Sequence, residues 1–232
     1  MIKAVVFDLD HTLFDRHATL RKIAPEFRRS FEVPDSVSDS EIADRWIYAD
    51  DHFIYDGWEY IFSYLVESGV FKTAPAFAQY RSFVYKNFER VAVPFEGTAP
   101  MLRELRKSGY KTGLITNGNH SLQYKKLKLL GLTAAFDEII VSGDVMTDKP
   151  DREIFRMMAD RLGVKTGEMI YVGDNPKNDI GGAARAGCRT VWMKSTGVWQ
   201  YSETVPDESV SRVEDIPAAV EKISRRAALS DK

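Results

Sequence analysis

The chain begins with a nearly continuous apolar run and then changes to a helical pattern. Residues 2–10, IKAVVFDLD, are rich in β-branched side chains, as in a strand that is buried on both faces of a parallel sheet. From about residue 16 to residue 93, apolar residues recur at spacings of three and four, which predicts helices over 39–53, 56–69 and 74–91. The sequence therefore predicts that the chain begins with one strand and continues with a block of helices.

Strands and helices alternate after the turn-rich segment at 93–100. The next predicted helix covers 98–109, with Thr98 as its N-cap and Gly109 at its end. The remaining pattern predicts strands over 110–116, 137–142, 168–174 and 189–193, and helices over 121–131, 150–163, 178–187 and 215–229.

Repeated β–α units with right-handed crossovers give a parallel sheet that helices cover on both faces. The predicted fold class is therefore α/β, a doubly wound parallel-sheet core with an inserted all-helical domain. Residues 1–15 and 94–232 form the predicted core, and residues 16–93 form the insert.

Composition is that of an ordinary globular protein, with 44% hydrophobic and 28% charged residues among 232 and a net charge of −2. This balance favours neither a nucleic-acid polymer nor an anionic membrane as a partner. The single cysteine, Cys188, excludes an internal disulfide and fits a reducing compartment, where we expect it to be packed under a strand. With no leader pattern and no long apolar run, we expect a cytoplasmic protein. We expect it to be a monomer or a homodimer.

Polar residues follow four of the predicted strands, at the end where open parallel sheets bind ligands. Their types are acidic, hydroxyl, amide and basic, and the topology brings them to one rim. They are Asp8, Asp10, Thr116, Asn117, Gly118, Lys149, Asp174 and Asp179.

These residue types suit phosphoryl transfer. Asp8, Asp174 and Asp179 are hard oxygen donors of the kind that Mg²⁺ prefers. A cation would also offset the repulsion between carboxylates crowded at the end of the first strand. Phosphate oxygens could be held by the Thr116 hydroxyl, by the backbone N–H groups of Asn117 and Gly118, and by the Lys149 ammonium.

Asp8 can attack phosphorus directly, because an ordinary aspartate with a pKa of about 3.9 is already ionised at neutral pH. Asp10, two residues later, can protonate the leaving oxygen and then activate water. That role needs a raised pKa, which a neighbouring carboxylate promotes and a nearby metal opposes.

The four motifs DLDHT, TNG, KP and GDNPKND, in this order and each after a strand, resemble those of the haloacid dehalogenase superfamily in its phosphatase branch. The resemblance spans the sheet domain, and residues 16–93 stand where that family inserts its small helical cap. It implies Asp8 as nucleophile and Asp10 as acid/base, with Thr116 and Lys149 on the phosphoryl group. It also implies Mg²⁺ held by Asp8, the main-chain carbonyl of Asp10 and Asp174, with Asp179 ligating or supporting nearby.

The sequence around and between these motifs is similar to that of 5′-nucleotidase-type and acylneuraminate-phosphate-phosphatase-type members of the superfamily. It implies a small phosphomonoester substrate, a nucleoside 5′-monophosphate first and a sugar phosphate second. The pattern departs from the family at Asn175, where serine is frequent, and we expect this to change only a supporting contact.

Three alternatives stay open. A phosphomutase needs the same core, and a non-catalytic phospho-acceptor domain gathers similar groups on a later strand without an insert. A 2-haloacid dehalogenase lacks the second aspartate of the first motif, so Asp10 disfavours it. Aromatic residues in the insert could stack on a nucleobase, although packing in a small helical core is the preferred interpretation. They are Trp46, Tyr48, Phe53, Tyr55, Trp58, Tyr60 and Phe62.

Overall fold

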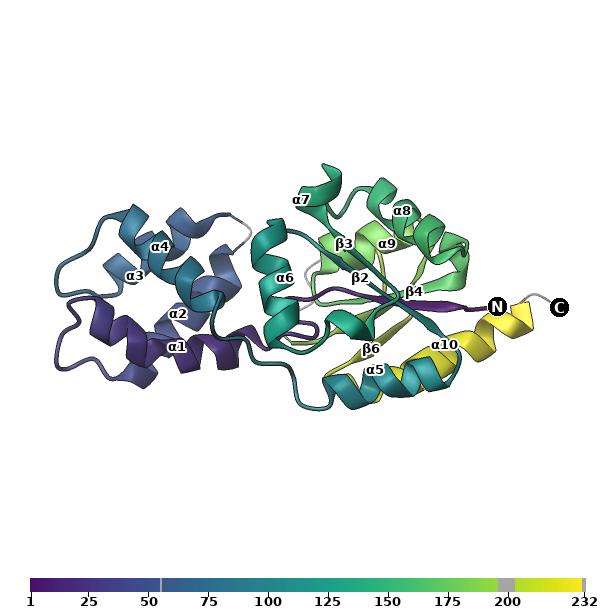
Figure 1. Ribbon diagram of the computed structural model, residues 1–232, viewed down its shortest axis with the longest axis horizontal. Coiled ribbons are helices and arrows are strands. Elements are labelled where there is room, and N and C mark those ends of the chain that lie inside the picture. The colour runs from purple at the N-terminus through teal and green to yellow at the C-terminus, as the bar shows by residue number, and fades with distance from the viewer. Residues whose placement is uncertain (55, 196–202, 231–232) are drawn as a thin grey trace. The chain divides into compact units, whose positions relative to one another are not determined.

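The computed structural model describes residues 1–54, 56–195 and 203–230 (Figure 1). The chain divides into two compact units, which we call the sheet unit (residues 1–15 and 94–232) and the helical unit (residues 16–93).

The sheet unit is built on six strands within the described residues, all parallel, in the order β3-β2-β1-β4-β5-β6. In register, Val6 of the central strand β1 lies opposite Gly113 of β2 and Tyr171 of β4. This topology confirms the predicted doubly wound α/β fold. The strands are β1 (Ala4–Phe7), β2 (Lys111–Thr116), β3 (Glu138–Val141), β4 (Met169–Gly173), β5 (Arg189–Met193) and β6 (Glu208–Val210).

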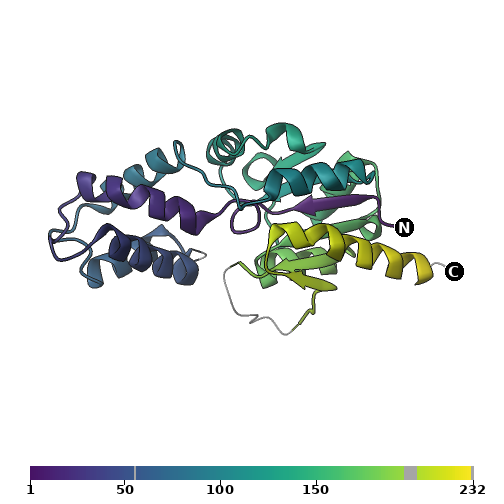
Figure 2. The same cartoon turned by 90° about the horizontal axis from the view of Figure 1, so that it is seen from below.

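Helices cover both faces of the sheet, with α8 and α9 on one side and α5 and α10 on the other (Figure 1). Figure 2 shows α5 and α10 side by side across their face. On the opposite face, Phe155 and Met158 of α8 pack in one buried cluster with Ala4 and Val6 of β1. The helices are α5 (Thr98–Lys107), α6 (His120–Leu129), α7 (Ser142–Val145), α8 (Arg152–Leu162), α9 (Gly182–Arg185) and α10 (Ile216–Ser230).

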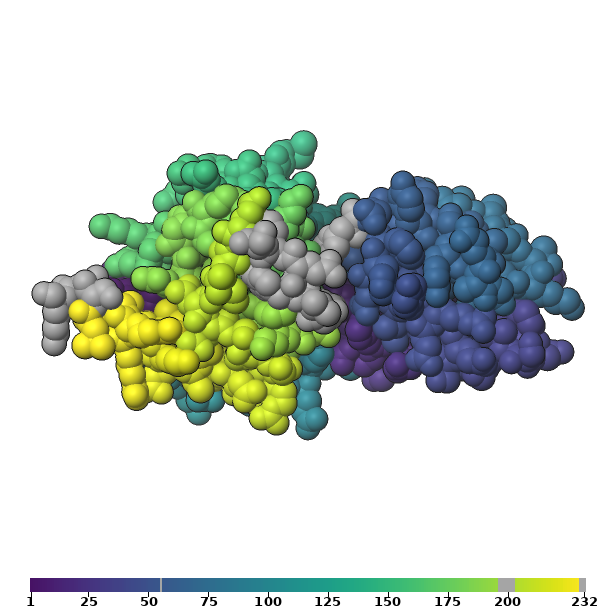
Figure 3. All heavy atoms as spheres, turned by 180° about the vertical axis from the view of Figure 1, so that it is seen from behind, coloured from purple at the N-terminus to yellow at the C-terminus, as the bar shows by residue number. Residues whose placement is uncertain are grey.

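The sixth strand is an element that the sequence did not predict. β6 is short, and only Val210 in it is buried. Helix α10, yellow on the surface in Figure 3, packs against this strand, and Lys222 Nζ lies 2.8 Å from Glu208 Oε1.

Two local predictions differ from the structure. Thr98 was expected to cap α5, but the N-cap is Gly97, at φ 83°, and Thr98 is the first helical residue. The Thr98 hydroxyl instead donates to the carbonyl of Phe95 at 2.8 Å. The helix expected over 178–187 is a π-helical turn, Pro176–Gly181, followed by the short α9.

The helical unit is held together by aromatic packing. Trp46 is fully buried, and its ring centroid lies 5.3 Å from that of Phe27 and 6.1 Å from that of Tyr80. Tyr48 and Tyr60 are exposed, so the aromatic residues are divided between core and surface, and Tyr55 lies outside the described residues. The unit contains α1 (Arg16–Ser30), α2 (Asp39–Phe53), α3 (Trp58–Glu67) and α4 (Phe77–Phe88).

The chain leaves the sheet unit and returns to it through two adjacent segments. Phe14 and Pro94 form a β-bridge, and the N–H of Phe95 donates to the carbonyl of Leu13 at 3.0 Å. The 78-residue helical unit is therefore inserted between two points that the sheet unit itself holds together.

Cys188 is buried, and burial raises the pKa of its thiol to about 12, so its packing is that of a small apolar residue. Across the part of the chain that the structure describes, no helix combines the length and apolar character that crossing a bilayer demands.

Candidate active site

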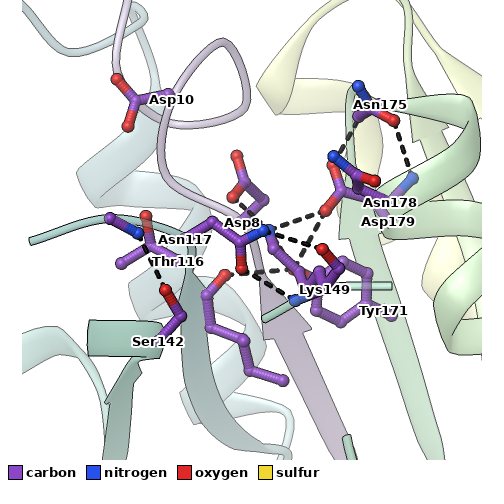
Figure 4. Close-up of polar contacts among 12 residues, drawn as sticks. Asp8, Asp10, Thr116, Asn117, Ser142, Lys149, Tyr171, Asn175, Asn178 and Asp179 are labelled. Carbon is purple, nitrogen blue, oxygen red and sulfur yellow. Dashed lines mark hydrogen bonds and ion pairs between the residues drawn. The ribbon is translucent and has the colours of Figure 1, made fainter. Parts of the chain in front are cut away.

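Asp8 is placed by the end of the central strand. Its N–H donates to the carbonyl of Val172 at 2.9 Å, which continues the ladder between β1 and β4 by one residue. Thr116 ends β2 and Gly173 ends β4, so the parallel strands deliver three chain segments to the same edge. Figure 4 shows the polar side chains that gather there.

Lys149 is the centre of a buried polar cluster. Its Nζ donates to Asp8 Oδ1 at 2.5 Å, to Asp179 Oδ1 at 2.7 Å and to the Tyr171 hydroxyl at 3.0 Å (Figure 4). The Tyr171 hydroxyl donates a hydrogen bond to the carbonyl of Ile115 at 3.1 Å. Burial alone would lower the pKa of Lys149, but the Asp179 and Asp8 carboxylates outweigh it and hold that pKa well above its usual value.

Asn117 and Gly118 hold the neighbouring loops in place. The Asn117 amide accepts from the N–H of Lys149 and donates to its carbonyl, both at 2.9 Å. The N–H of Gly118 donates to Ser142 Oγ at 3.0 Å. In this structure Asn117 therefore positions Lys149, and the Gly118 N–H that we expected to contact a phosphate is bonded to Ser142.

Three acids gather beside Lys149. Carboxylate oxygens of Asp8, Asp174 and Asp179 all lie within 4.8 Å of one another, and all three side chains are buried. Burial raises the pKa of Asp8 to about 7 although the Lys149 ammonium opposes the shift. Burial, followed by the charges of Asp179 and Asp8, holds the pKa of Asp174 well above its usual range. The charge of one ammonium does not neutralise three carboxylates. A bound divalent cation would add positive charge and so favour their ionised forms.

The donor set fits Mg²⁺, because it consists of carboxylate oxygens alone. Gly173 leaves space for the Asp179 carboxylate, because a Cβ at position 173 would lie 2.5 Å from Asp179 Cγ. A larger residue there would displace that carboxylate. The N–H of Asn175 donates to Asp179 Oδ2 at 2.9 Å, and the Asn175 side chain accepts from the N–H groups of Lys177 and Asn178. Asn175 thus supports an acid of the cluster from the start of the next helix.

Asp10 and Thr116 share a second set of contacts, which comes from helix α6. The carboxylate of Asp10 contacts α6, where Lys126 Nζ lies 2.7 Å from Asp10 Oδ1, and the charge of Asp10 adds to the effect of burial in raising the pKa of Asp8 and of Asp174. Gln123 Nε2 donates to Asp10 Oδ2 at 3.1 Å and also to Thr116 Oγ1. The structure therefore gathers Asp8, Lys149, Asp174 and Asp179, and places Asp10 and Thr116 in a second network.

Sequence reasoning missed Gln123, Lys126 and Tyr171. A signal for two of them was present, because Gln123, Lys126 and Leu127 share one face of α6. A lysine and a glutamine on the buried face of a helix indicate polar partners inside the fold. Tyr171 lies in the apolar run of β4, where only its hydroxyl distinguishes it from a packing residue.

Replacing Lys149 with methionine should destabilise the protein, because it leaves the buried carboxylates of Asp8 and Asp179 without their ammonium. Removing one partner of a buried ion pair typically costs about 3–5 kcal/mol of unfolding free energy. Urea denaturation without metal measures the loss, and added Mg²⁺ should recover part of it. The exposed Lys177→Met is the matched control, and equal stability of the two variants would contradict the assignment.

Several known proteins and one protein family resemble this chain in sequence. Residues 5–193 match the family described as haloacid dehalogenase-like hydrolase. A glyceraldehyde 3-phosphate phosphatase of Methanopyrus kandleri is 30% identical over 97% of this chain and 100% of its own. The N-acylneuraminate-9-phosphatase of Rattus norvegicus is 37% identical over 58% of this chain and 55% of its own, so the chain spans about half of that relative.

Among solved structures, a phosphatase of the same family from Thermococcus onnurineus has a TM-score of 0.62 and 26% identity, over 94% of this chain and 98% of that chain. The relatives named here are phosphatases, and this confirms the predicted enzyme class, a phosphoric monoester hydrolase. The match over most of the chain and the acids gathered at its strand ends lead to one conclusion. This chain belongs to the haloacid dehalogenase-like hydrolase family, in its phosphatase branch.

Proposed function

We propose that the protein is an Mg²⁺-dependent phosphatase that hydrolyses a small phosphomonoester through an aspartyl-phosphate on Asp8. The observation that carries this proposal is the position of Asp8. Its carboxylate is buried at the end of β1, within 4.8 Å of carboxylate oxygens of Asp174 and Asp179 and 2.5 Å from the Lys149 ammonium. A nucleophile, a candidate cation site and a fixed positive charge are thus within reach of one phosphoryl group.

In the first step of the proposed reaction, an Asp8 carboxylate oxygen forms a bond to phosphorus and the ester P–O bond breaks. Asp10 gives its proton to the departing alkoxide, which leaves as an alcohol. In the second step, Asp10 takes a proton from water, the water oxygen attacks phosphorus, and the bond to Asp8 breaks to release inorganic phosphate. Lys149 and Thr116 bind the phosphoryl oxygens, and bound Mg²⁺ supplies charge neutralisation for nucleophile and substrate.

A sugar-type phosphate is the substrate class that the relatives favour. Glyceraldehyde 3-phosphate and an N-acylneuraminate 9-phosphate, named in their activities, both carry the phosphate on the terminal carbon of a hydroxylated chain. We therefore place sugar phosphates ahead of nucleoside 5′-monophosphates, which reverses our order from the sequence. The helical unit, residues 16–93, is proposed as the cap that sets this choice, because it is inserted between the first and second motifs.

A screen of phosphorylated metabolites with Mg²⁺, read as released inorganic phosphate, tests the proposal. We expect turnover of sugar phosphates, weaker turnover of nucleotides, and none with Asp8→Asn. Each alternative has its own product: an isomerised sugar phosphate from a phosphomutase, halide from a haloacid dehalogenase, and a stable phosphoprotein from a phospho-acceptor domain. Any of these products without release of inorganic phosphate would overturn the proposed function.

A further inference from the structure

Two buried polar residues of α6 hold the carboxylate of Asp10. Lys126 Nζ lies 2.7 Å from Asp10 Oδ1 and 2.9 Å from Oδ2, and Gln123 Nε2 donates to Oδ2 at 3.1 Å. Three residues apart on a helix, Gln123 and Lys126 project from the same face. Asn119 fixes the start of this helix by accepting from the N–H of Ser121 at 2.9 Å. The carboxylate of Asp10 is therefore oriented by two donors on a rigid element, and the ammonium favours its ionised form, which takes the proton from water in the second proposed step.

The burial of Lys126 sets it apart from its neighbours. Its side chain is 3% exposed, whereas Lys125 and Lys128 of the same helix are exposed. Taking an ammonium out of water costs free energy that only well-placed partners offset. Here they include the Asp10 carboxylate and the ring of Phe14, whose centroid lies 5.1 Å from Nζ. The Asp10 side chain is 25% exposed, so solvent reaches the carboxylate that the buried lysine orients.

Gln123 joins Asp10 to Thr116. Its side-chain nitrogen contacts Thr116 Oγ1, Asp10 Oδ2 and, at 3.3 Å, the carbonyl of Asn117. An amide nitrogen carries two hydrogens, so it cannot serve three acceptors fully at once. Because the Thr116 hydroxyl accepts from Gln123, its own hydrogen is left to donate to a phosphate oxygen. One buried amide thus contacts both the Asp10 carboxylate and the hydroxyl that is proposed to bind phosphate.

We propose that Lys126 and Gln123 are positioning residues, which act on the reaction by fixing the Asp10 carboxylate and coupling it to Thr116. The inference rests on the proposed function and deepens it, because neither residue belongs to the four motifs. Substrate binding depends mainly on other groups, so the loss of either contact should lower kcat far more than it changes KM.

Lys126→Met tests the proposal, with Lys126→Arg as the conservative variant and the exposed Lys128→Met as the matched control. We expect Lys126→Met to lower kcat by about 10- to 100-fold, because a displaced acid/base loses most of its contribution. KM should stay within about threefold of the wild-type value, arginine should recover part of kcat, and Lys128→Met should match the wild type.

A double-mutant cycle with Asp10→Asn separates positioning from general damage. If Lys126 acts through Asp10, adding Lys126→Met to Asp10→Asn should cause little further loss of kcat. A merely structural lysine would reduce kcat by the same factor in both backgrounds, and that result would overturn the inference. Gln123→Leu should show the same dependence on Asp10.

Crystal structures of the wild type and Lys126→Met give a readout that needs no turnover. The Asp10 carboxylate should leave its place beside α6 in the variant, and an unmoved carboxylate would overturn the inference. The two proposals fail separately. An active wild type that Lys126→Met equals in kcat removes only the positioning role, whereas a wild type that hydrolyses no phosphomonoester removes the proposed function.

Discussion

Asp8→Asn should lower kcat by about 10⁴-fold or more, because losing a covalent nucleophile removes the reaction path itself. The change is nearly isosteric, and Lys149 keeps its contact with Asp179 at 2.7 Å, so the fold should remain intact. Phosphate release measures the activity, and circular dichroism with thermal unfolding checks the fold. The exposed Asp160→Asn, on α8, is the matched control and should behave as the wild type.

A second measurement identifies the covalent step. Brief incubation with a labelled substrate, followed by acid quenching, should trap label on the wild-type protein and none on Asp8→Asn. Retention of about a tenth of the wild-type rate by that variant would assign the attack to another group.

Chelation with EDTA should abolish turnover, and Mg²⁺ should restore it. The physical reason is the crowding of Asp8, Asp174 and Asp179, where burial raises the pKa of Asp8 to about 7 and holds that of Asp174 well above its usual range. A bound divalent cation would favour the ionised carboxylates and would offset the repulsion between the Asp8 carboxylate and an anionic substrate. Full activity in EDTA would contradict the metal assignment.

The metal can also be followed without turnover. A cation bound by the three acids of the folded state, as proposed, should raise the unfolding temperature of the wild type when Mg²⁺ is added. Asp174→Asn removes one proposed ligand, and it should raise the Mg²⁺ concentration needed for half-activation by about 10-fold or more. The exposed Asp160→Asn again provides the control.

The main strands were predictable because burial on both faces leaves a long apolar signature. Residues 2–10 and 189–193 are examples, and both contain strands in the structure. β6 carries no such signature, because a three-residue edge strand with only Val210 buried lacks any period that a sequence pattern could reveal. The N-cap of α5 was misplaced because Thr98 has the usual capping side chain, whereas Gly97 supplies the left-handed backbone that starts the helix.

The acid cluster was predictable from topology, and the second network was not. Asp8 and Asp174 follow β1 and β4 directly, so the rule for parallel strand ends brings them together. Asp10 is only two residues further, but its carboxylate takes the direction that Lys126 and Gln123 set. That direction depends on which face of α6 meets the loop, a tertiary fact that local spacing does not contain.

The bridge between Phe14 and Pro94 has a consequence for how this protein can change over time. Because the two ends of the inserted segment are held together by the sheet unit, the segment can be replaced without an added entropic cost of bringing its ends together. A lineage could therefore exchange, shorten or enlarge the enclosed segment while β1 keeps its register. Selection for new substrates and conservation of the chemistry would then act on separate stretches of the same gene.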